Sequence, residues 1–324
     1  MRGNISLKIE GKKYRIGIDL GGTFIKGGIV DSEGNLLVYN KTPTEVEKGE
    51  NCITDNIATL CKTLIKQADL PLNAVVGVGM GVPGMIDSQK GVVIFSGNLH
   101  FTNYPIATAL EARINLPVKI GNDANVATLG EMKFGSGKAY KNAVLLTLGT
   151  GVGGGVVING KLLEGNRSAG AELGHLVIVS NGEKCTCGRK GCLEAYASAS
   201  ALIRDTKRAM NRDKTSKMWE IGSIENVTGK TAFDYMTKDA SAKAVVENYI
   251  KKLGEGITDF ANVFRPEAIL LGGGVCAEGD KLVKPLQAFL DKHIFAGEKG
   301  PRVKILQATL GNLAGILGAG ALVS

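Results

Sequence analysis

Apolar runs and glycine-rich turns alternate along the chain in a pattern that occurs twice. Residues 15–37 read RIGIDLGGTFIKGGIVDSEGNLL, and residues 144–163 read VLLTLGTGVGGGVVINGKLL. Both contain an apolar run, a turn rich in Gly and Thr, a second apolar run, a polar turn and a short third run, which predicts three strands in each. At one constant offset, Asp19 aligns with Thr147 and Gly27 with Gly155. We therefore interpret the second segment as a repeat of the first.

Helices and further strands follow both segments in the same order. Helical spacing of apolar residues marks 51–68, 105–114 and 124–134 in the first half, and 241–264, 284–294 and 312–322 in the second. Buried strands are predicted at 74–83, 117–123, 268–274 and 303–308. The order βββαβαβα thus occurs twice, with a cysteine-rich insert in the second copy. It predicts an α/β protein of two lobes, with a central cleft at which both glycine-rich hairpins point.

Length and composition favour a two-domain cytoplasmic protein. The 324 residues suffice for two domains of about 100–200 residues each. The first residues, MRGNISLKIEGKKYR, lack an apolar signal segment, and no run of about 18 apolar residues could cross a membrane. The formal charge is +8, but the densest basic segment, 204–217, mixes both signs. That mixture indicates a solvated helix face rather than a nucleic-acid surface, so we expect neither nucleic acid nor membrane as a partner.

Three glycine-rich turns are candidate phosphate sites: DLGGT at 19–23, LGTGVGGG at 148–155 and LGGGV at 271–275. Glycine lets backbone N–H groups approach a ligand, and a carboxylate beside such a turn suits Mg²⁺. Tight hairpins with glycines for packing are the alternative for each turn. Neither a P-loop nor a Rossmann fingerprint is present, which argues against NAD-dependent chemistry. The candidate residues for ATP and Mg²⁺ are Asp19, Gly21, Gly22, Thr23, Lys26, Gly149, Thr150, Gly151, Gly273, Gly274 and Asn312.

For two of these candidates, a purely structural role is the alternative to nucleotide binding. Lys26 lies near the first turn and is either a phosphate contact or an exposed strand lysine. Asn312 lies at the start of the last predicted helix, where it either caps that helix or approaches the nucleotide.

Three cysteines lie within eight positions in the segment HLVIVSNGEKCTCGRKGCLE, residues 175–194. Structural zinc takes four tetrahedral N or S ligands, and His175 completes Cys185, Cys187 and Cys192 to such a set. A disulfide with one free thiol, or three inert thiols, are the alternatives, and a reducing compartment disfavours the first. A closed shell of four protein ligands leaves no position for water. We therefore predict a structural rather than a catalytic zinc ion.

The chain resembles the ROK family of bacterial sugar kinases, within the actin, sugar kinase and Hsp70 superfamily, and most of all its glucokinases. The resemblance runs from about residue 15 to the C-terminus. The Cys-rich motif is its most specific part. The matching motifs, in order, are DLGGT (19–23), GVPG (81–84), GNDANVA (121–127), LGTGVGGG (148–155), ELGH (172–175) and CTCGRKGCLE (185–194).

This resemblance implies a two-lobed, actin-like (ribonuclease H-like) ATPase fold and an ATP-dependent hexokinase. Asp123 would be the general base that takes the proton of the sugar 6-hydroxyl, with Mg-ATP as donor and glucose as the expected hexose. The alternative for Asp123 is an N-cap of the following helix. A homodimer is also implied. The positions that would bind the sugar are Asn98, Asn122, Asp123, Glu172, His175 and Glu194.

The sugar's identity is the less specific part of this expectation. The glucokinase pattern has an aromatic residue shortly after the Asn-Leu pair, where this chain has NLHFTNY, so Phe101 or Tyr104 would have to substitute. A ROK kinase for fructose, mannose, allose or an N-acetylhexosamine is therefore the alternative. Because the zinc ligands flank Glu172 and Glu194, we also expect the metal to hold these two carboxylates in place.

We expect a small lobe of residues 1–120 with the C-terminal helix 311–324, and a large lobe of 121–310 that carries the zinc-binding loop 175–194. A sugar-responsive repressor of the same family is a competing function. Such repressors carry an N-terminal DNA-binding domain, whereas DLGGT begins here at residue 19, so we expect the enzyme.

Overall fold

The computed structural model describes residues 13–323 and divides into two compact units. Unit 1 comprises Met1–Gly135, Glu164–Gly170 and Asn312–Ser324, and unit 2 comprises Ser136–Leu163 and Ala171–Gly311. Most of the N-terminal segment MRGNISLKIEGKKYR, which lacks an apolar signal stretch, lies outside the described residues. None of the helices within 13–323 is long and apolar enough to cross a membrane.

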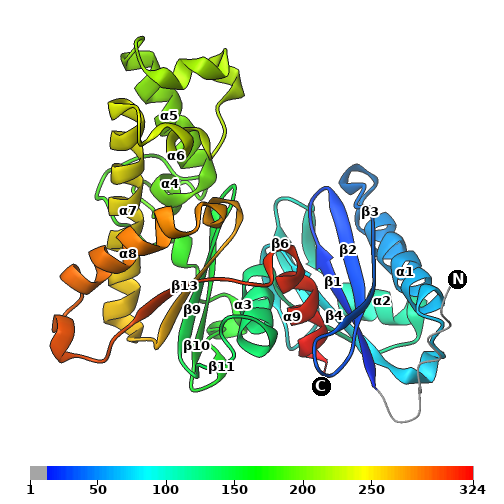
Figure 1. Cartoon of the computed structure of the whole chain (residues 1–324). Coiled ribbons are helices and arrows are strands. Elements are labelled where there is room, and N and C mark those ends of the chain that lie inside the picture. Colours follow the sequence, from blue (N-terminus) through cyan, green and yellow to red (C-terminus); the bar gives the residue numbers. More distant parts are fainter. Residues whose placement is uncertain (1–12, 324) are drawn as a thin grey trace, which may run out of the picture. The chain divides into compact units, whose positions relative to one another are not determined.

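Unit 1 is built on a mixed five-stranded sheet with the order β3-β2-β1-β4-β8 (Figure 1). Its strands are β1 (Tyr14–Leu20), β2 (Phe24–Val30), β3 (Leu36–Pro43), β4 (Val75–Val82) and β8 (Val118–Asn122). Strands β1 to β3 form an antiparallel meander, and β4 and β8 run parallel to β1. Its helices are α1 (Glu50–Gln67), α2 (Ile106–Ile114), α3 (Asp123–Phe134) and α9 (Ala314–Leu322).

Unit 2 repeats this topology with the order β11-β10-β9-β12-β13. Its strands are β9 (Ala143–Leu148), β10 (Val152–Ile158), β11 (Lys161–Leu162), β12 (Ala268–Gly272) and β13 (Lys304–Gln307). Its helices are α4 (Glu194–Ala197), α5 (Ala199–Arg212), α6 (Thr231–Tyr235), α7 (Ala240–Phe264) and α8 (Asp280–His293). The equivalent strand orders confirm the predicted duplication of an α/β motif. The cleft that we expect between the lobes stays a prediction.

The register of the two hairpins corrects one detail of the predicted repeat. Asp19 lies opposite Lys26 of β2, and Thr147 lies opposite Gly153 of β10, so β1 and β9 are equivalent at these positions. The second hairpin, however, closes on a shorter turn, because Leu148 pairs directly with Val152. As a result Gly27 is equivalent to Gly154 rather than to the Gly155 of the constant offset.

Glycines let helix α9 pack closely against the sheet and against α3 in unit 1. A Cβ atom at Gly79 of β4 would collide with the carbonyl of Ala319, and one at Gly318 would collide with the carbonyl of Val126. Close backbone packing of this kind explains why the last helix is rich in Gly and Ala. It also places α3 in unit 1, whereas the sequence-based boundary at residue 121 assigned α3 to the large lobe. The division into a small and a large lobe stays a prediction.

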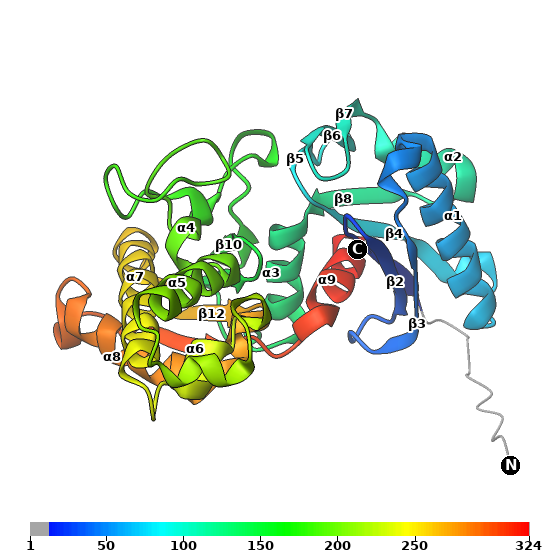
Figure 2. The same cartoon turned by 90° about the horizontal axis from the view of Figure 1, so that it is seen from above.

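Most predicted elements agree with the structure within a few residues at each end. Helix α8 begins at Asp280 rather than at the predicted residue 284, and Pro285 lies inside the helix. A small sheet of β5 (Met85–Asp87), β6 (Val92–Ser96) and β7 (Phe101–Tyr104) was not predicted. Its strands are too short to give a clear two-residue periodicity. Figure 2 shows this small sheet beside β8.

Candidate functional site

The carboxyl edge of the sheet in unit 1 brings several predicted residues together. Asp19 of β1 lies beside Gly81 of β4, and Asn122 ends the next parallel strand, β8. Asp123 follows as the first residue of α3, and a Cβ at Gly81 would lie 3.6 Å from its Cα atom. Ligands of open α/β sheets bind at the carboxyl ends of the strands. These acidic and amide side chains therefore occupy the edge where a site is expected.

Asn122, and not Asp123, is the N-cap of α3. The Asn122 Oδ1 atom accepts hydrogen bonds from the backbone N–H groups of Ala124 and Asn125, at 3.0 and 3.2 Å. Asp123 is exposed, and its Oδ1 atom accepts from Ala124 N at 2.9 Å. The helix is thus capped by the preceding residue, which leaves the capping alternative for Asp123 without support. An acidic side chain in the first helical turn is also electrostatically favourable.

Asp19 and Lys26 form an ion pair across the first glycine turn, with Lys26 Nζ 3.1 Å from Asp19 Oδ2. Both side chains are partly exposed, at 24% for Asp19 and 35% for Lys26. The half-exposed carboxylate is the ligand type that Mg²⁺ prefers, so Asp19 fits the predicted metal position. Thr44, which the sequence analysis missed, is buried and donates its hydroxyl to the Gly21 carbonyl at 2.7 Å. This hydrogen bond links the residue after β3 to the first glycine turn and stabilises the turn.

Each glycine turn contains a glycine at which a Cβ atom would press on neighbouring protein atoms. A Cβ at Gly21 would lie 2.9 Å from the carbonyl oxygen of Phe24. A Cβ at Gly151 would collide with Glu194 Oε2, and one at Gly273 would press on the backbone of Leu148. Packing therefore explains why glycine occupies these three positions, in agreement with the alternative of tight hairpins.

Each turn also contains one glycine that packing does not explain. A Cβ at Gly149 or Gly274 would meet no atom within 4 Å, and one at Gly22 would meet only the Asn98 carbonyl, at 3.8 Å. None of the three has a left-handed backbone conformation that would favour glycine. Open space beside a glycine is the expected result where a ligand approaches the backbone closely. The contact at Gly22 also places Asn98, an exposed residue after β6, next to the first turn.

Three further candidate nucleotide contacts are exposed. Thr23 and Thr150 are exposed at the tips of the first and second hairpins. Asn312 is exposed in a short 3-10 helix, Gly311–Leu313, that precedes α9. The N-cap of α9 is Leu313, so Asn312 does not cap that helix.

His175, Cys185, Cys187 and Cys192 converge in unit 2, with all their ligand atoms within 4.8 Å of one another. Cys187 Sγ lies 3.7 Å from Cys192 Sγ, and Cys185 Sγ lies 3.6 Å from His175 Nδ1. Tetrahedral zinc with bonds of about 2.3 Å to sulfur and 2.0–2.1 Å to nitrogen would separate such atoms by about 3.8 and 3.5 Å. The cluster therefore fits a zinc ion.

A tight turn brings these ligands together. The Cys185 N–H donates to the Arg189 carbonyl at 2.8 Å, and the Gly188 N–H donates back to the Cys185 carbonyl at 3.1 Å. Gly188 and Gly191 have φ angles of 90° and 85°, a conformation that residues with side chains rarely adopt. The glycines of the C-x-C-G-x-x-G-C motif thus serve the turn that arranges the thiols.

The thiols of this cluster differ in their surroundings. Burial raises the pKa of Cys192 to about 12 and raises the pKa of Cys185 as well. The backbone N–H of Arg189 instead lowers the pKa of the exposed Cys187 thiol. All six cysteines of the chain are free thiols, which removes the disulfide alternative.

The two predicted sugar carboxylates differ in how firmly they are held. Glu172 is exposed and precedes a short 3-10 helix, Leu173–His175, that carries the histidine of the cluster. Glu194 is half-buried at the start of α4, and both its oxygens accept hydrogen bonds, one from Thr186 and one from the backbone of Val152. Thr186 and the Val152 amide were not predicted as contacts of Glu194, because a motif does not show which of its residues meet across the fold.

The two aromatic residues considered as substitutes in NLHFTNY belong to the core of unit 1. Phe101 is fully buried and Tyr104 is 8% exposed, and their ring centroids lie 5.2 Å apart. The Tyr104 hydroxyl lies 2.9 Å from the buried Thr54 hydroxyl. Neither ring therefore offers a free aromatic face to a ligand.

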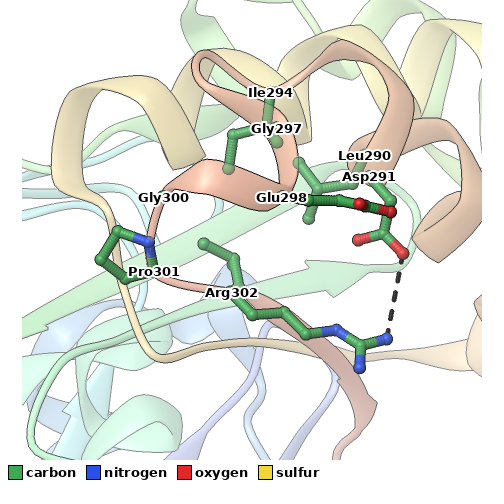
Figure 3. A pocket seen from close by; sticks show the side chains of 9 residues that line it. Leu290, Asp291, Ile294, Gly297, Glu298, Gly300, Pro301 and Arg302 are labelled. Atoms are coloured by element: carbon green, nitrogen blue, oxygen red, sulfur yellow. Dashed lines mark ion pairs between the residues drawn. The ribbon is translucent and has the colours of Figure 1, made fainter.

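A pocket of about 370 Å³ in unit 2 lies apart from these groups. It is formed by the end of α8 and the segment 297–303, and Figure 3 shows the ion pair of Asp291 and Arg302 beside it. The pocket contains none of the glycine turns, predicted sugar ligands or cysteines, so we do not assign the chemistry to it.

Comparison with known proteins agrees with this geometry. The glucokinase of Streptomyces coelicolor is 36% identical over 313 residues, which cover 94% of this chain and 95% of that protein. A ROK family glucokinase from Streptomyces griseus, solved in complex with glucose and AMPPNP, has a TM-score of 0.81 and 34% identity, with coverage of 97% and 99%. The xylose repressor of Bacillus subtilis is 28% identical, with coverage of 96% of this chain and 77% of the repressor.

The structural likeness confirms the actin-like ATPase fold that the family resemblance implies, and the strand orders agree with the repeated motif. The sequence profile of the ROK family matches residues 15–324, almost the whole chain. The chain therefore belongs to the ROK family.

Proposed function

We propose that this protein is a glucokinase, an ATP-dependent hexokinase that transfers the γ-phosphoryl group of Mg-ATP to the 6-hydroxyl of glucose. The observation that carries the proposal is the exposed Asp123 carboxylate at the first turn of α3, in a helix that Asn122 caps. The similarity to glucokinases at 36% identity over nearly the full chain supports it. The product, glucose 6-phosphate, would enter glycolysis.

In the proposed reaction, Asp123 accepts the proton of the 6-hydroxyl as that oxygen attacks the γ-phosphorus. The bond from the γ-phosphorus to the oxygen that bridges it to the β-phosphate breaks, and ADP leaves. We assign sugar recognition to Asn98, Asn122, Asp123, Glu172, His175 and Glu194. Sites that bind sugar hydroxyls discriminate strongly between sugars. An analogue that lacks one of these hydroxyls leaves a polar group of the site unpaired in the complex.

The glycine turns are the proposed nucleotide contacts. Gly22, Gly149 and Gly274 leave open space for phosphate or nucleoside beside the backbone. The other proposed nucleotide contacts are Gly21, Thr23, Thr150, Gly151, Gly273 and Asn312. Mg²⁺ bound to ATP would neutralise phosphate charge, with Asp19 as its protein ligand. Lys26 is proposed to contact the phosphates directly.

Zinc is proposed for the His175, Cys185, Cys187 and Cys192 set, as a structural ion. Four protein ligands fill a tetrahedral shell, so bound zinc would supply rigidity and no reactive water. The thiols and the histidine are already gathered at distances that suit the metal.

We further propose a cytoplasmic homodimer that needs neither nucleic acid nor membrane. Six free thiols suit a reducing compartment. Several cations of the basic segment 204–217, which begins within α5, pair with acidic neighbours, for example Arg208 with Glu183 and Lys207 with Glu225. Light scattering on the purified protein measures the oligomeric state directly.

A hexose panel tests the proposed activity. With ATP and Mg²⁺ in a coupled assay of ADP release, we expect glucose to have the highest kcat/KM and turnover to cease without Mg²⁺. A higher kcat/KM for fructose, mannose, allose or an N-acetylhexosamine would reassign the substrate. Absence of turnover with every hexose would refute the proposed function.

An alanine at Gly149 tests the nucleotide contact. Because its Cβ would meet no protein atom within 4 Å, the variant Gly149→Ala should fold with an unchanged Tm. The added methyl group should hold the phosphates away from the backbone and raise the KM for ATP roughly tenfold. The control is Gly229→Ala, whose Cβ meets only Ala199 at 3.8 Å. Equal KM values for ATP in both variants would contradict the assignment of Gly149.

A further inference from the structure

The Glu194 carboxylate joins two segments of unit 2 that are far apart in sequence. Its Oε1 atom accepts the hydroxyl of Thr186, in the cysteine loop, at 2.7 Å. Its Oε2 atom accepts the backbone N–H of Val152, at the start of β10, at 3.0 Å. The Glu194 side chain thus contacts both the cysteine loop, through Thr186, and the β9–β10 hairpin, through Val152.

The hairpin is held against this carboxylate by further contacts. Gly151 lies so close that any Cβ would collide with Glu194 Oε2. The Ala199 N–H donates to the Gly149 carbonyl at 2.8 Å, and the Ser200 hydroxyl donates to the Thr150 carbonyl at the same distance. The segment from Glu194 to Ser200 therefore supports the whole turn of the hairpin.

Thr186 holds Glu194 from the other side. It lies between Cys185 and Cys187 but offers a hydroxyl, which is not a usual zinc ligand. Cys185 Sγ is also near Glu194 Oε1, at 3.5 Å. The Thr186 hydroxyl, at 2.7 Å, is thus the closer of the two groups to this oxygen.

We propose that Thr186 is a positioning residue for sugar recognition. Its hydroxyl fixes the Glu194 carboxylate against the β9–β10 hairpin, so Thr186 acts on the sugar through this hydrogen bond. The loop, the carboxylate and the hairpin then form a single support. The inference rests on the proposed function, in which Glu194 binds the sugar and the hairpin binds the nucleotide.

Two substitutions separate the hydroxyl from the shape of the side chain. Thr186→Val keeps the branched shape and removes the donor, whereas Thr186→Ser keeps the donor. Since hydrogen bonds to charged groups are strong, we expect Thr186→Val to raise the glucose Kd and KM about tenfold. Thr186→Ser should stay within about twofold of the parent, because the donor remains. Zinc content and Tm should match the parent in both variants.

A double-mutant cycle with Glu194→Gln shows whether Thr186 acts through the carboxylate. If it does, Thr186→Val should change the glucose Kd far less in the Glu194→Gln protein than in the parent. Calorimetry measures the Kd values without turnover, and metal analysis gives zinc per chain. Gly151→Ala supplies a second approach, because it displaces the same carboxylate from the hairpin side and should also raise the glucose Kd.

Three results would overturn the inference in a parent protein that binds and phosphorylates glucose. One is a normal glucose Kd in zinc-loaded Thr186→Val. Another is equal weakening by Thr186→Val and Thr186→Ser, and the third is full additivity with Glu194→Gln. A parent protein that binds no hexose would instead refute the proposed function, and the calorimetry of the parent distinguishes that case.

Discussion

Replacing Asp123 by asparagine is expected to lower kcat about 1,000-fold, within the range that general bases contribute, while glucose still binds. An amide cannot take the proton of the 6-hydroxyl, but it retains the size of the carboxylate and a carbonyl oxygen for the backbone contact to Ala124. Asp123 is exposed and is not the N-cap, so the fold should tolerate the change. Steady-state kinetics with ATP and glucose, together with glucose binding by calorimetry, measure both effects.

The neighbouring residue supplies the matched control for stability. Asn122→Ala removes the side chain that caps α3, which should cost about 1 kcal/mol of unfolding free energy and lower the Tm. Asp123→Asn should leave the Tm close to that of the parent protein. Turnover retained by Asp123→Asn would contradict its assignment as general base, and a large fall in its Tm would show that the loss of activity is structural.

Replacing Cys187 by serine is expected to remove zinc and to raise the glucose KM at least tenfold. Zinc binding by such sets is strongly favourable, and three ligands should not retain the ion as four do. Without the metal, the loop that carries Glu172, His175 and Thr186 loses its cross-link, and the carboxylates at its two ends lose their support. Metal analysis, thermal unfolding and kinetics for both substrates follow the change.

Cys52→Ser is the control for a general effect of losing a thiol. Cys52 lies half-exposed on α1 in unit 1, outside the cluster, so its substitution should leave zinc content and the glucose KM unchanged. A zinc-free, folded Cys187→Ser protein with a normal glucose KM would contradict the proposed link between the metal and the sugar carboxylates. Chelation of the parent protein should reproduce the effect of Cys187→Ser if the metal is responsible.

The duplicated fold was predictable because its signals are local. Apolar runs, glycine turns and helical periodicity each act over fewer than about twenty residues, and both copies contain them in the same order. The cysteine cluster was equally accessible, because its three thiols share one turn and His175 is the one histidine near them in sequence. These features depend on neighbours along the chain.

The detailed site depended on contacts between distant segments. A constant offset could not reveal the shorter second hairpin, because register is set by which residues pair across the strands. The sequence pattern also left open whether Asp123 or its neighbour caps α3, since both side chains can accept the backbone N–H groups. Phe101 and Tyr104 were considered as ligand contacts, but their burial in the core could be seen only in three dimensions.

The amino-acid sequence alone determined the repeated α/β motif, the four-ligand cluster and the family of sugar kinases to which the chain belongs. The tertiary structure decided which glycines are needed for packing and which leave room for a ligand, as at Gly151 and Gly149. It also decided that Glu194 is held from two sides, by Thr186 and Val152. The physical reason is that the sequence gives the chemical type of each side chain. The space around it and its hydrogen-bond partners depend on distant residues that only folding brings near.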